Sequence, residues 1–253
     1  MLYLSLVLAF VASILLTPVV KALAFKVGAV DRPNYRKVHA RIMPRLGGLA
    51  IFGSFLVGYF VLRPEDSTAL YIVLGAVMII ITGVLDDMFE ITAKAKLLGQ
   101  FIAAGIVIYG GLQIDFINLP FGGQLDFGYF SIPLTILWIV GITNAINLID
   151  GLDGLAAGVS TIALVTLAGM AFLMGDMFVF AMAAILAASC AGFLFYNFHP
   201  AKIFMGDSGS LFLGYMIGVL ALLGFKNVTV ISLIIPIIML GVPISDTFFA
   251  IVR

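Results

Sequence analysis

The sequence predicts an all-α membrane protein that crosses the bilayer several times. Of its 253 residues, 63% are hydrophobic and only 10% are charged, whereas a soluble domain carries about 25% charged residues. The mean hydropathy is +1.22. Apolar runs of about the 20 residues that a bilayer requires recur along the whole chain. These observations exclude a soluble globular domain with a single membrane anchor.

The apolar runs predict about nine transmembrane helices. No internal repeat or linker separates them, so we expect a single domain over residues 1–253. The first run lacks a basic segment and a cleavage site, so we interpret it as a mature span. The predicted spans are Leu2–Leu23, Leu46–Leu62, Ala69–Leu85, Leu97–Leu112, Ile132–Ile149, Leu155–Met174, Phe178–Tyr196, Leu211–Phe225 and Val228–Val252.

The connection from Gln113 to Ser131 departs from the helical pattern. It reads QIDFINLPFGGQLDFGYFS, two stretches of alternating apolar and polar residues around the turn sequence PFGG. This pattern predicts a small β-hairpin. We expect the hairpin to lie on the extracytoplasmic membrane surface.

The basic residues predict the orientation. The loop from Gly28 to Arg45 is strongly basic, and if it is cytoplasmic, only Arg63 and Lys226 of the 13 basic residues fall outside. The amino terminus is then outside, and the carboxyl terminus is inside. Under this orientation the acids at helix ends gather on the inner side: Asp86, Asp87, Asp150, Asp153, Asp207 and Asp246. Acids beside hydrocarbon are costly unless they are paired, hydrated or bound to a cation, so we predict a functional site there.

The stretch NAINLIDGLDGL places Asn144, Asn147, Asp150 and Asp153 at a spacing of three. Each step of three on a helix turns the side chain by about 60°, so the first three share a face. The two glycines of the stretch allow a bend that brings Asp153 back to the same site. The alternative is a helix end whose polar residues meet water.

The segment YNFHPAKIFMGDSGSL, residues 196–211, sets Asp207 among small residues at a predicted helix start. Such a start offers free backbone N–H groups to an anion, and the carboxylate can hold a hard cation such as Mg²⁺. The alternative for Asp207 is a helix cap. Phe204 either stacks on a base or anchors the chain at the interface.

Each basic residue near these acids has two interpretations, one functional and one concerning membrane topology. Lys96 opens the fourth run and either contacts phosphate or anchors the helix at the membrane boundary. His39 and Arg45 belong to the basic loop, which binds phosphate or reports topology and anionic lipid. In PRLGG, Gly47 and Gly48 allow another backbone to approach closely.

The paired acids Asp86-Asp87, NAINLIDGLDGL and FMGDSGS, with PRLGG upstream, resemble the polyprenyl-phosphate N-acetylhexosamine-1-phosphate transferase superfamily. The resemblance covers residues 31–246. It implies that undecaprenyl phosphate attacks the β-phosphorus of a UDP-sugar and releases UMP, at the cytoplasmic face of a bacterial plasma membrane. The chain looks most like the branch that uses UDP-N-acetylglucosamine to prime teichoic acid or O-antigen synthesis. The alternative branch is phospho-N-acetylmuramoyl-pentapeptide transferase.

The resemblance also implies roles for individual residues. Asp207 and Asp87 would bind Mg²⁺, with Mn²⁺ as a substitute, and Asp87 would face the lipid phosphate as its base. Asp86 would support Asp87, while Asp150 and Asp153 would order the site. The residues expected to contact substrate are Asn144, Asn147, Asn197, Phe204, Lys96, Arg45 and His39.

Two departures from the family pattern stand out. Glu90 occupies a position where the peptidoglycan branch has Lys, and the His-rich loop expected after the ninth span is not in the sequence. We therefore expect the chain to be truncated at its carboxyl end. The competing class is a cation-coupled secondary transporter. We expect no nucleic-acid partner, and we leave homodimer formation open.

Overall fold

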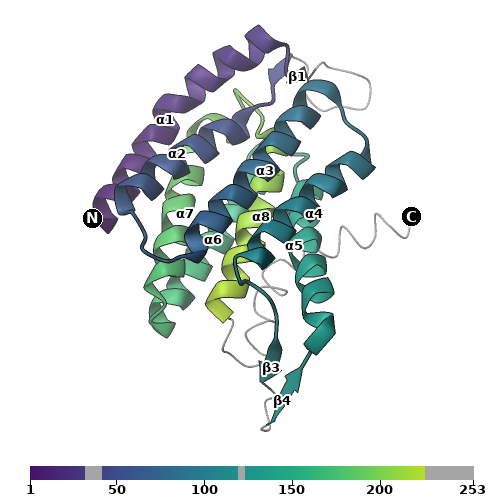
Figure 1. The fold of residues 1–253 in the computed structure, drawn as a ribbon. Coiled ribbons are helices and arrows are strands. Elements are labelled where there is room, and N and C mark those ends of the chain that lie inside the picture. The colour runs from purple at the N-terminus through teal and green to yellow at the C-terminus, as the bar shows by residue number, and fades with distance from the viewer. Residues whose placement is uncertain (32–41, 119–122, 226–253) are drawn as a thin grey trace.

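The computed structural model describes residues 1–31, 42–118 and 123–225, and within them the chain is mainly helical (Figure 1). The helices are α1 Leu2–Val27, α2 Gly47–Leu62, α3 Thr68–Phe89, α4 Ala93–Tyr109, α5 Ser131–Leu148, α6 Leu155–Met174, α7 Met177–Asn197 and α8 Gly206–Phe225. The shorter elements are β1 Val30–Asp31, β2 Met43–Pro44, β3 Phe116–Asn118, β4 Gln124–Asp126 and the 3₁₀ helix η1 Gly128–Phe130.

The helices confirm the class of polytopic helical membrane protein. Six of them, counting η1 together with α5, are long and apolar enough to cross a bilayer, and α2 is a shorter apolar helix. Each of the first eight predicted spans corresponds to one helix, whereas the ninth, residues 228–252, lies outside the described ranges. The number of crossings and their orientation stay predictions.

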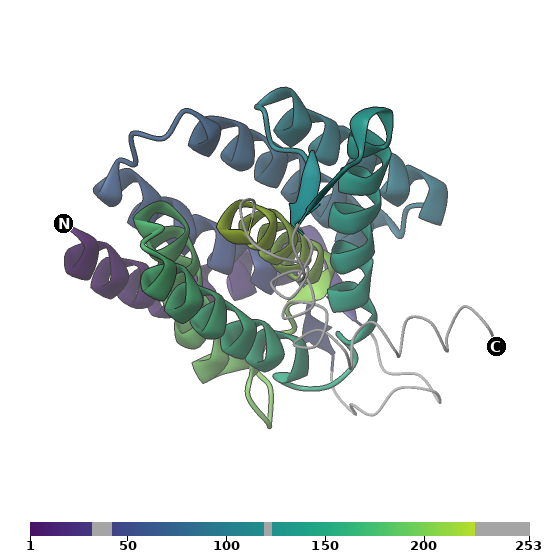
Figure 2. The same ribbon diagram turned by 90° about the horizontal axis from the view of Figure 1, so that it is seen from below.

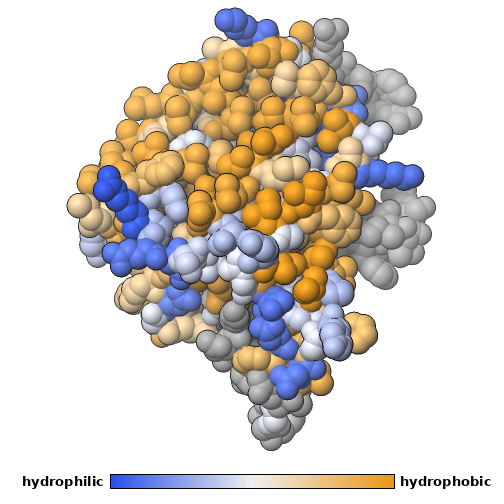
Figure 3. Space-filling model, viewed as in Figure 1, coloured by the Kyte–Doolittle hydropathy of each residue, from blue (hydrophilic) through white to orange (hydrophobic). Residues whose placement is uncertain are grey.

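The surface of the molecule carries many exposed apolar side chains, as a protein in contact with lipid requires. Apolar residues cover much of the face shown in Figure 3. Exposed apolar side chains also recur every three or four residues along α1: Leu4, Val7, Val11, Leu15 and Val19. This spacing places them on one side of the helix, which suits contact with hydrocarbon.

Helix α8 is the centre of the bundle. Every residue from Ser208 to Leu222 is buried, and Figure 2 shows the other helices arranged around α8. Its partners include α3, α5, α2 and α6. A helix that is apolar on all sides needs such surroundings, because no face of it is suited to water.

The start of α8 lies against α2 and α3 at main-chain distance. A Cβ built on Gly48 would meet the backbone nitrogen of Gly209 at 2.1 Å, and a Cβ on Gly83 would meet the Ser208 Cα at 2.4 Å. The expected close approach at PRLGG is therefore present. The first two amides of α2 donate hydrogen bonds to the carbonyls of residues 204 and 205, at 3.1 and 2.9 Å. These bonds satisfy two N–H groups that a helix start would otherwise leave without partners.

Two short antiparallel pairs complete the fold. In the first, Val30 pairs with Pro44 and Asp31 with Met43, which joins the two ends of the basic loop. In the second, Phe116 pairs with Asp126, within the segment expected to form a hairpin. Figure 1 shows β3 and β4 at the opposite end of the molecule from β1. The location of this pair outside the cell stays a prediction.

We predict that Gly48→Ala destabilises the protein, because the added methyl overlaps the backbone of α8. Overpacking of this kind costs about 1–3 kcal/mol, which lowers the melting temperature by roughly 5 °C. Thermal unfolding in detergent micelles measures the change. Gly158→Ala is the matched control, because a Cβ on this α6 glycine meets nothing within 4 Å. Equal melting temperatures for the two variants would contradict the packing argument.

Candidate active site

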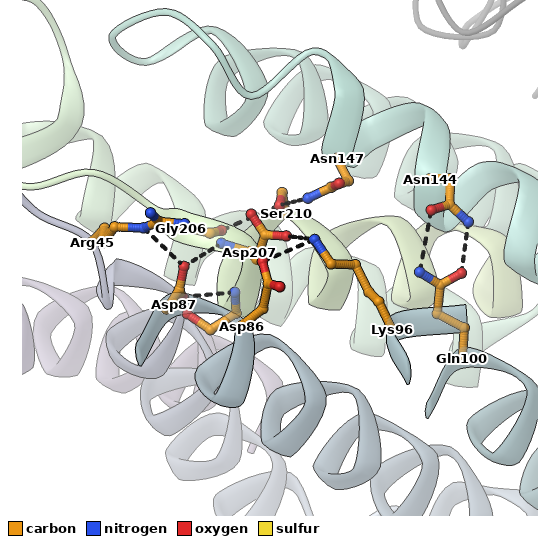
Figure 4. Close-up of polar contacts among 11 residues, drawn as sticks. Arg45, Asp86, Asp87, Lys96, Gln100, Asn144, Asn147, Gly206, Asp207 and Ser210 are labelled. Carbon is orange, nitrogen blue, oxygen red and sulfur yellow. Dashed lines mark hydrogen bonds and ion pairs between the residues drawn. The ribbon is translucent and has the colours of Figure 1, made fainter. Parts of the chain in front are cut away.

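The amino end of α8 is fastened to the carboxyl end of α3 by one carboxylate. Asp87 accepts hydrogen bonds from the backbone amides of Asp207 and Ser208, at 2.9 and 3.0 Å (Figure 4). Our expectation that α8 begins with free N–H groups for a substrate anion is therefore wrong for these two amides. A carboxylate of the protein occupies the place instead, where the helix dipole favours negative charge.

Gly206 makes this arrangement possible. Its φ is +72°, a left-handed conformation that side chains rarely adopt. A Cβ at this position would lie 2.1 Å from the Arg45 carbonyl oxygen and 2.6 Å from an oxygen of Asp87. Both the backbone conformation and the lack of space therefore require glycine here.

Lys96 connects the two more accessible acids. Its ammonium group lies 2.9 Å from Asp86 and also forms an ion pair with Asp207 (Figure 4). The side chains of Asp86 and Asp207 are 9% and 19% accessible, whereas that of Asp87 is fully buried. Lys96 thus lies beside the acids, where residues from α3, α4 and α8 meet. Its contact with phosphate stays a prediction.

Arg45 provides the second cation, in front of α2. Its Nε lies 3.3 Å from Asp87. Partial burial lowers the pKa of Arg45, but the nearby carboxylates of Asp87 and Asp207 raise it more, so the net shift is upward. Arg45 is thus a permanent positive charge beside the acids.

Asp150 lies close enough to the other acids to be affected by them. Burial raises the pKa of its carboxyl to about 7, the charges of Asp207 and Asp87 add to the increase, and Arg45 opposes it. One turn earlier, near the end of α5, the Asn147 side chain donates to the Ser210 hydroxyl of α8 at 2.8 Å. The predicted convergence of Asp87, Asp150 and Asp207 is therefore present. The Ser210 hydroxyl is an additional contact that the motif spacing does not indicate.

Asn144 has a partner that the sequence analysis missed. Its amide and that of Gln100 exchange two hydrogen bonds, at 2.6 and 3.2 Å, which join α5 to α4 (Figure 4). Asn144 therefore contacts another side chain in this structure instead of standing open for substrate. Gln100 is one helical turn after Lys96 on an otherwise apolar helix. A polar residue at this spacing indicates that it shares the helix face of Lys96 and needs a polar partner.

Asp153 lies in different surroundings. The bend after α5 is present, with Gly154 at φ +70°, but it leads Asp153 to the loop that follows α7. There its carboxylate contacts His199 Nδ1 and the Ala201 amide, both at 3.0 Å. This arrangement ties two loops together and corrects the prediction that Asp153 returns to the face of Asn144.

The other predicted substrate contacts have structural partners. The buried Asn197 donates to the carbonyl of Ile203 at 3.0 Å and shapes the same loop. The backbone of Phe204 bonds to Pro44 and Gly47, which holds this half-buried aromatic beside PRLGG. His39 lies outside the described residues.

Two of the acids meet the chemical requirements of a magnesium site. Among the residues that the structure describes, no group of three or more His, Cys, Asp or Glu is arranged to hold a metal ion. Mg²⁺, however, usually takes one or two carboxylates together with phosphate oxygens and water. Asp86 and Asp207 fit this requirement. Both are partly accessible, and the ammonium group of Lys96 between them shows that this pair of carboxylates binds positive charge.

Fold and site together define a polytopic helical membrane protein with a charged, partly buried centre at one end of its helices. A sequence profile described as glycosyl transferase family 4 matches residues 69–225. A probable undecaprenyl-phosphate N-acetylglucosaminyl 1-phosphate transferase of Bacillus subtilis is 53% identical, over 98% of this chain and 71% of the relative. The chain belongs to glycosyl transferase family 4 and thereby to the polyprenyl-phosphate hexosamine-1-phosphate transferases, so the resemblance seen in the motifs is confirmed.

More distant relatives come from both branches considered above. A decaprenyl-phosphate N-acetylglucosaminephosphotransferase of Mycolicibacterium smegmatis is 34% identical, over 92% of this chain and 66% of the relative. A phospho-N-acetylmuramoyl-pentapeptide-transferase of Halalkalibacterium halodurans is 33% identical, over 91% of this chain and 77% of the relative. The chain thus spans between about two thirds and about three quarters of the length of these relatives.

We predict that the Gln100–Asn144 pair contributes about 1 kcal/mol of coupling energy, as hydrogen bonds between membrane helices do. A double-mutant cycle with Gln100→Leu and Asn144→Leu, read by thermal unfolding in detergent, measures it. Combining Gln100→Leu with Thr166→Val is the control, because the exposed Thr166 is on α6 and its hydroxyl donates to the Ile162 carbonyl of the same helix. Additive effects of the leucine pair would contradict this assignment.

We predict that Asp150 makes stability depend on pH. Its pKa is about 7 in the folded protein and about 4 in an unfolded chain, so the protonated carboxyl favours folding. Its contribution is fully present below pH 4 and is lost as pH rises through 7. In EDTA, the melting temperature of Asp150→Asn should therefore rise relative to that of the wild type as the pH increases from 5 to 8. A difference that is independent of pH would contradict the raised pKa.

Proposed function

We propose that this chain transfers N-acetylglucosamine 1-phosphate from UDP-N-acetylglucosamine to undecaprenyl phosphate and releases UMP, in a reaction that needs Mg²⁺. A phosphate oxygen of the lipid forms a bond to the β-phosphorus of the nucleotide sugar. The bond from that phosphorus to the bridging oxygen breaks, and UMP leaves with the bonding electrons. We place the site at the cytoplasmic face, because the positive-inside distribution favours it.

One observation carries this proposal: Lys96 is bound between Asp86 and Asp207 at the ends of three helices. A lipid phosphate and a diphosphate repel each other, so their reaction requires positive charge on both sides of the reacting phosphorus. Lys96 and Arg45 provide fixed positive charges for this purpose. Asp86 and Asp207 would hold Mg²⁺, which neutralises charge on the diphosphate and orients it.

The position of the acids supports an enzyme over a transporter. Asp86 and Asp87 stand in the last turn of α3, and Asp207 stands in the first turn of α8. Coupling sites of secondary transporters lie near the middle of the bilayer. A site at helix ends is accessible both to a soluble nucleotide sugar and to the head of a lipid, as the proposed reaction requires.

The choice of sugar follows from the relatives. The relative named for N-acetylglucosamine transfer is 53% identical, and the one named for the muramoyl-pentapeptide is 33% identical. We therefore favour UDP-N-acetylglucosamine as donor and a role in starting a cell-wall polymer of the teichoic acid or O-antigen type. The muramoyl-pentapeptide donor is the second candidate.

We expect the intact protein in nanodiscs to release UMP from UDP-N-acetylglucosamine only when undecaprenyl phosphate and Mg²⁺ are both present. EDTA should stop the reaction, and added Mg²⁺ should restore it. Asp207→Asn should lower turnover by at least about a thousandfold, because a carboxylate next to the diphosphate is lost. Glu65→Gln is the control, since this exposed residue lies in the loop between α2 and α3.

Three outcomes would overturn parts of this proposal. UMP release only from the muramoyl-pentapeptide nucleotide would replace the donor. Solute movement down an ion gradient without UMP release would replace the enzyme with a transporter. Normal turnover of Asp207→Asn would remove this acid from the site.

A further inference from the structure

Asp87 and Asp86 are neighbours in the sequence, but they have different surroundings. Adjacent residues on a helix point about 100° apart, and here Asp86 faces Lys96 while Asp87 faces the start of α8. The side chain of Asp87 is fully buried. A group that exchanges a proton with a lipid phosphate, or binds an ion carried by substrate, has to be accessible to them.

Both oxygens of Asp87 are already engaged. Oδ1 accepts from the Asp207 amide at 2.9 Å and from Arg45 Nε at 3.3 Å, and Oδ2 accepts from the Ser208 amide at 3.0 Å. Proton transfer to either oxygen would compete with donors that are themselves buried or partly buried. Losing these bonds would leave main-chain N–H groups without partners, which is costly in a site with little water.

Gly206 covers the same carboxylate. The position of a Cβ on Gly206 lies 2.6 and 2.7 Å from the two oxygens of Asp87, closer than carbon and oxygen atoms normally approach. The backbone of Gly206 thus leaves no room for a methyl group on this side. A whole phosphate group or a hydrated ion is larger than a methyl group, so neither fits on this side of the carboxylate.

We infer that Asp87 is a positioning residue that fixes the start of α8 to the end of α3 and thereby aims Asp207 at Asp86 and Lys96. The two bonded amides belong to Asp207 and Ser208, so Asp87 determines the direction in which the Asp207 side chain leaves the helix. Asp86, Asp207 and Lys96 then form the accessible part of the site. This assignment replaces the expected roles of Asp87 as base and metal ligand. It deepens the proposed function, and the turnover test described below rests on that function.

Hydrogen exchange of residues 206–210, followed by mass spectrometry on the protein without substrate or metal, tests the inference directly. In Asp87→Asn the side-chain oxygen still accepts one hydrogen bond, but the new –NH₂ group cannot accept the other. One of the two α8 amides therefore loses its acceptor, and we expect exchange in this segment to become about tenfold faster. In Asp87→Ala both acceptors are lost, and exchange should be faster still. Asp176→Asn is the matched control, because its carboxylate accepts from the Val179 amide at the start of another helix, α7. It should leave exchange of residues 206–210 unchanged.

Turnover separates positioning from proton transfer. Asn is as good a helix cap as Asp, but it is not a base, so a positioning role predicts that Asp87→Asn retains at least about tenfold more activity than Asp87→Ala. A catalytic base predicts equal and near-complete loss in both variants. The inference is overturned if exchange in 206–210 is unchanged in Asp87→Asn, or if this variant is no more active than Asp87→Ala. The exchange result needs no substrate, so it stands apart from the proposed reaction.

Discussion

The structure depends on the contact between the start of α8 and the main chains of α2 and α3. Gly48 and Gly83 leave no side chain between these helices, so the backbone of α8 approaches both directly. Its first amides then come within hydrogen-bond distance of Asp87 at the end of α3. A larger residue at either glycine would overlap the backbone of α8 and push its start away from these helices.

Charge pairing follows from this packing. The acids that meet at the ends of α3 and α8 are enclosed by apolar helices, where an unpaired charge is costly. Lys96 from α4 and Arg45 from the segment before α2 balance them. The fixed cations serve folding when the site is empty, and they suit an anionic substrate when it binds. Stability and proposed chemistry thus use the same residues.

The motif NAINLIDGLDGL shows how far spacing predicts a site. Asn147 and Asp150 do lie beside the start of α8, as their common helix face indicated. The same face also contains Asn144, but one turn away from the acids it meets Gln100 of α4. Asp153 follows the end of α5, where the regular rotation of a helix no longer applies, and its carboxylate joins the loop after α7. Periodicity predicts neighbours only while the helix continues.

The sequence by itself determined the membrane class, the positions of the first eight helices and the family, because hydropathy and short motifs are local properties of the chain. It also indicated that acids from distant segments meet, since the alternating direction of the helices brings their ends to one side. Only the tertiary structure decided what each acid contacts. Asp86 and Asp87 are chemically identical neighbours, and the turn of about 100° between them directs one to Lys96 and the other to the amides of α8. That difference comes from the packing of three helices, which no single segment of the sequence contains.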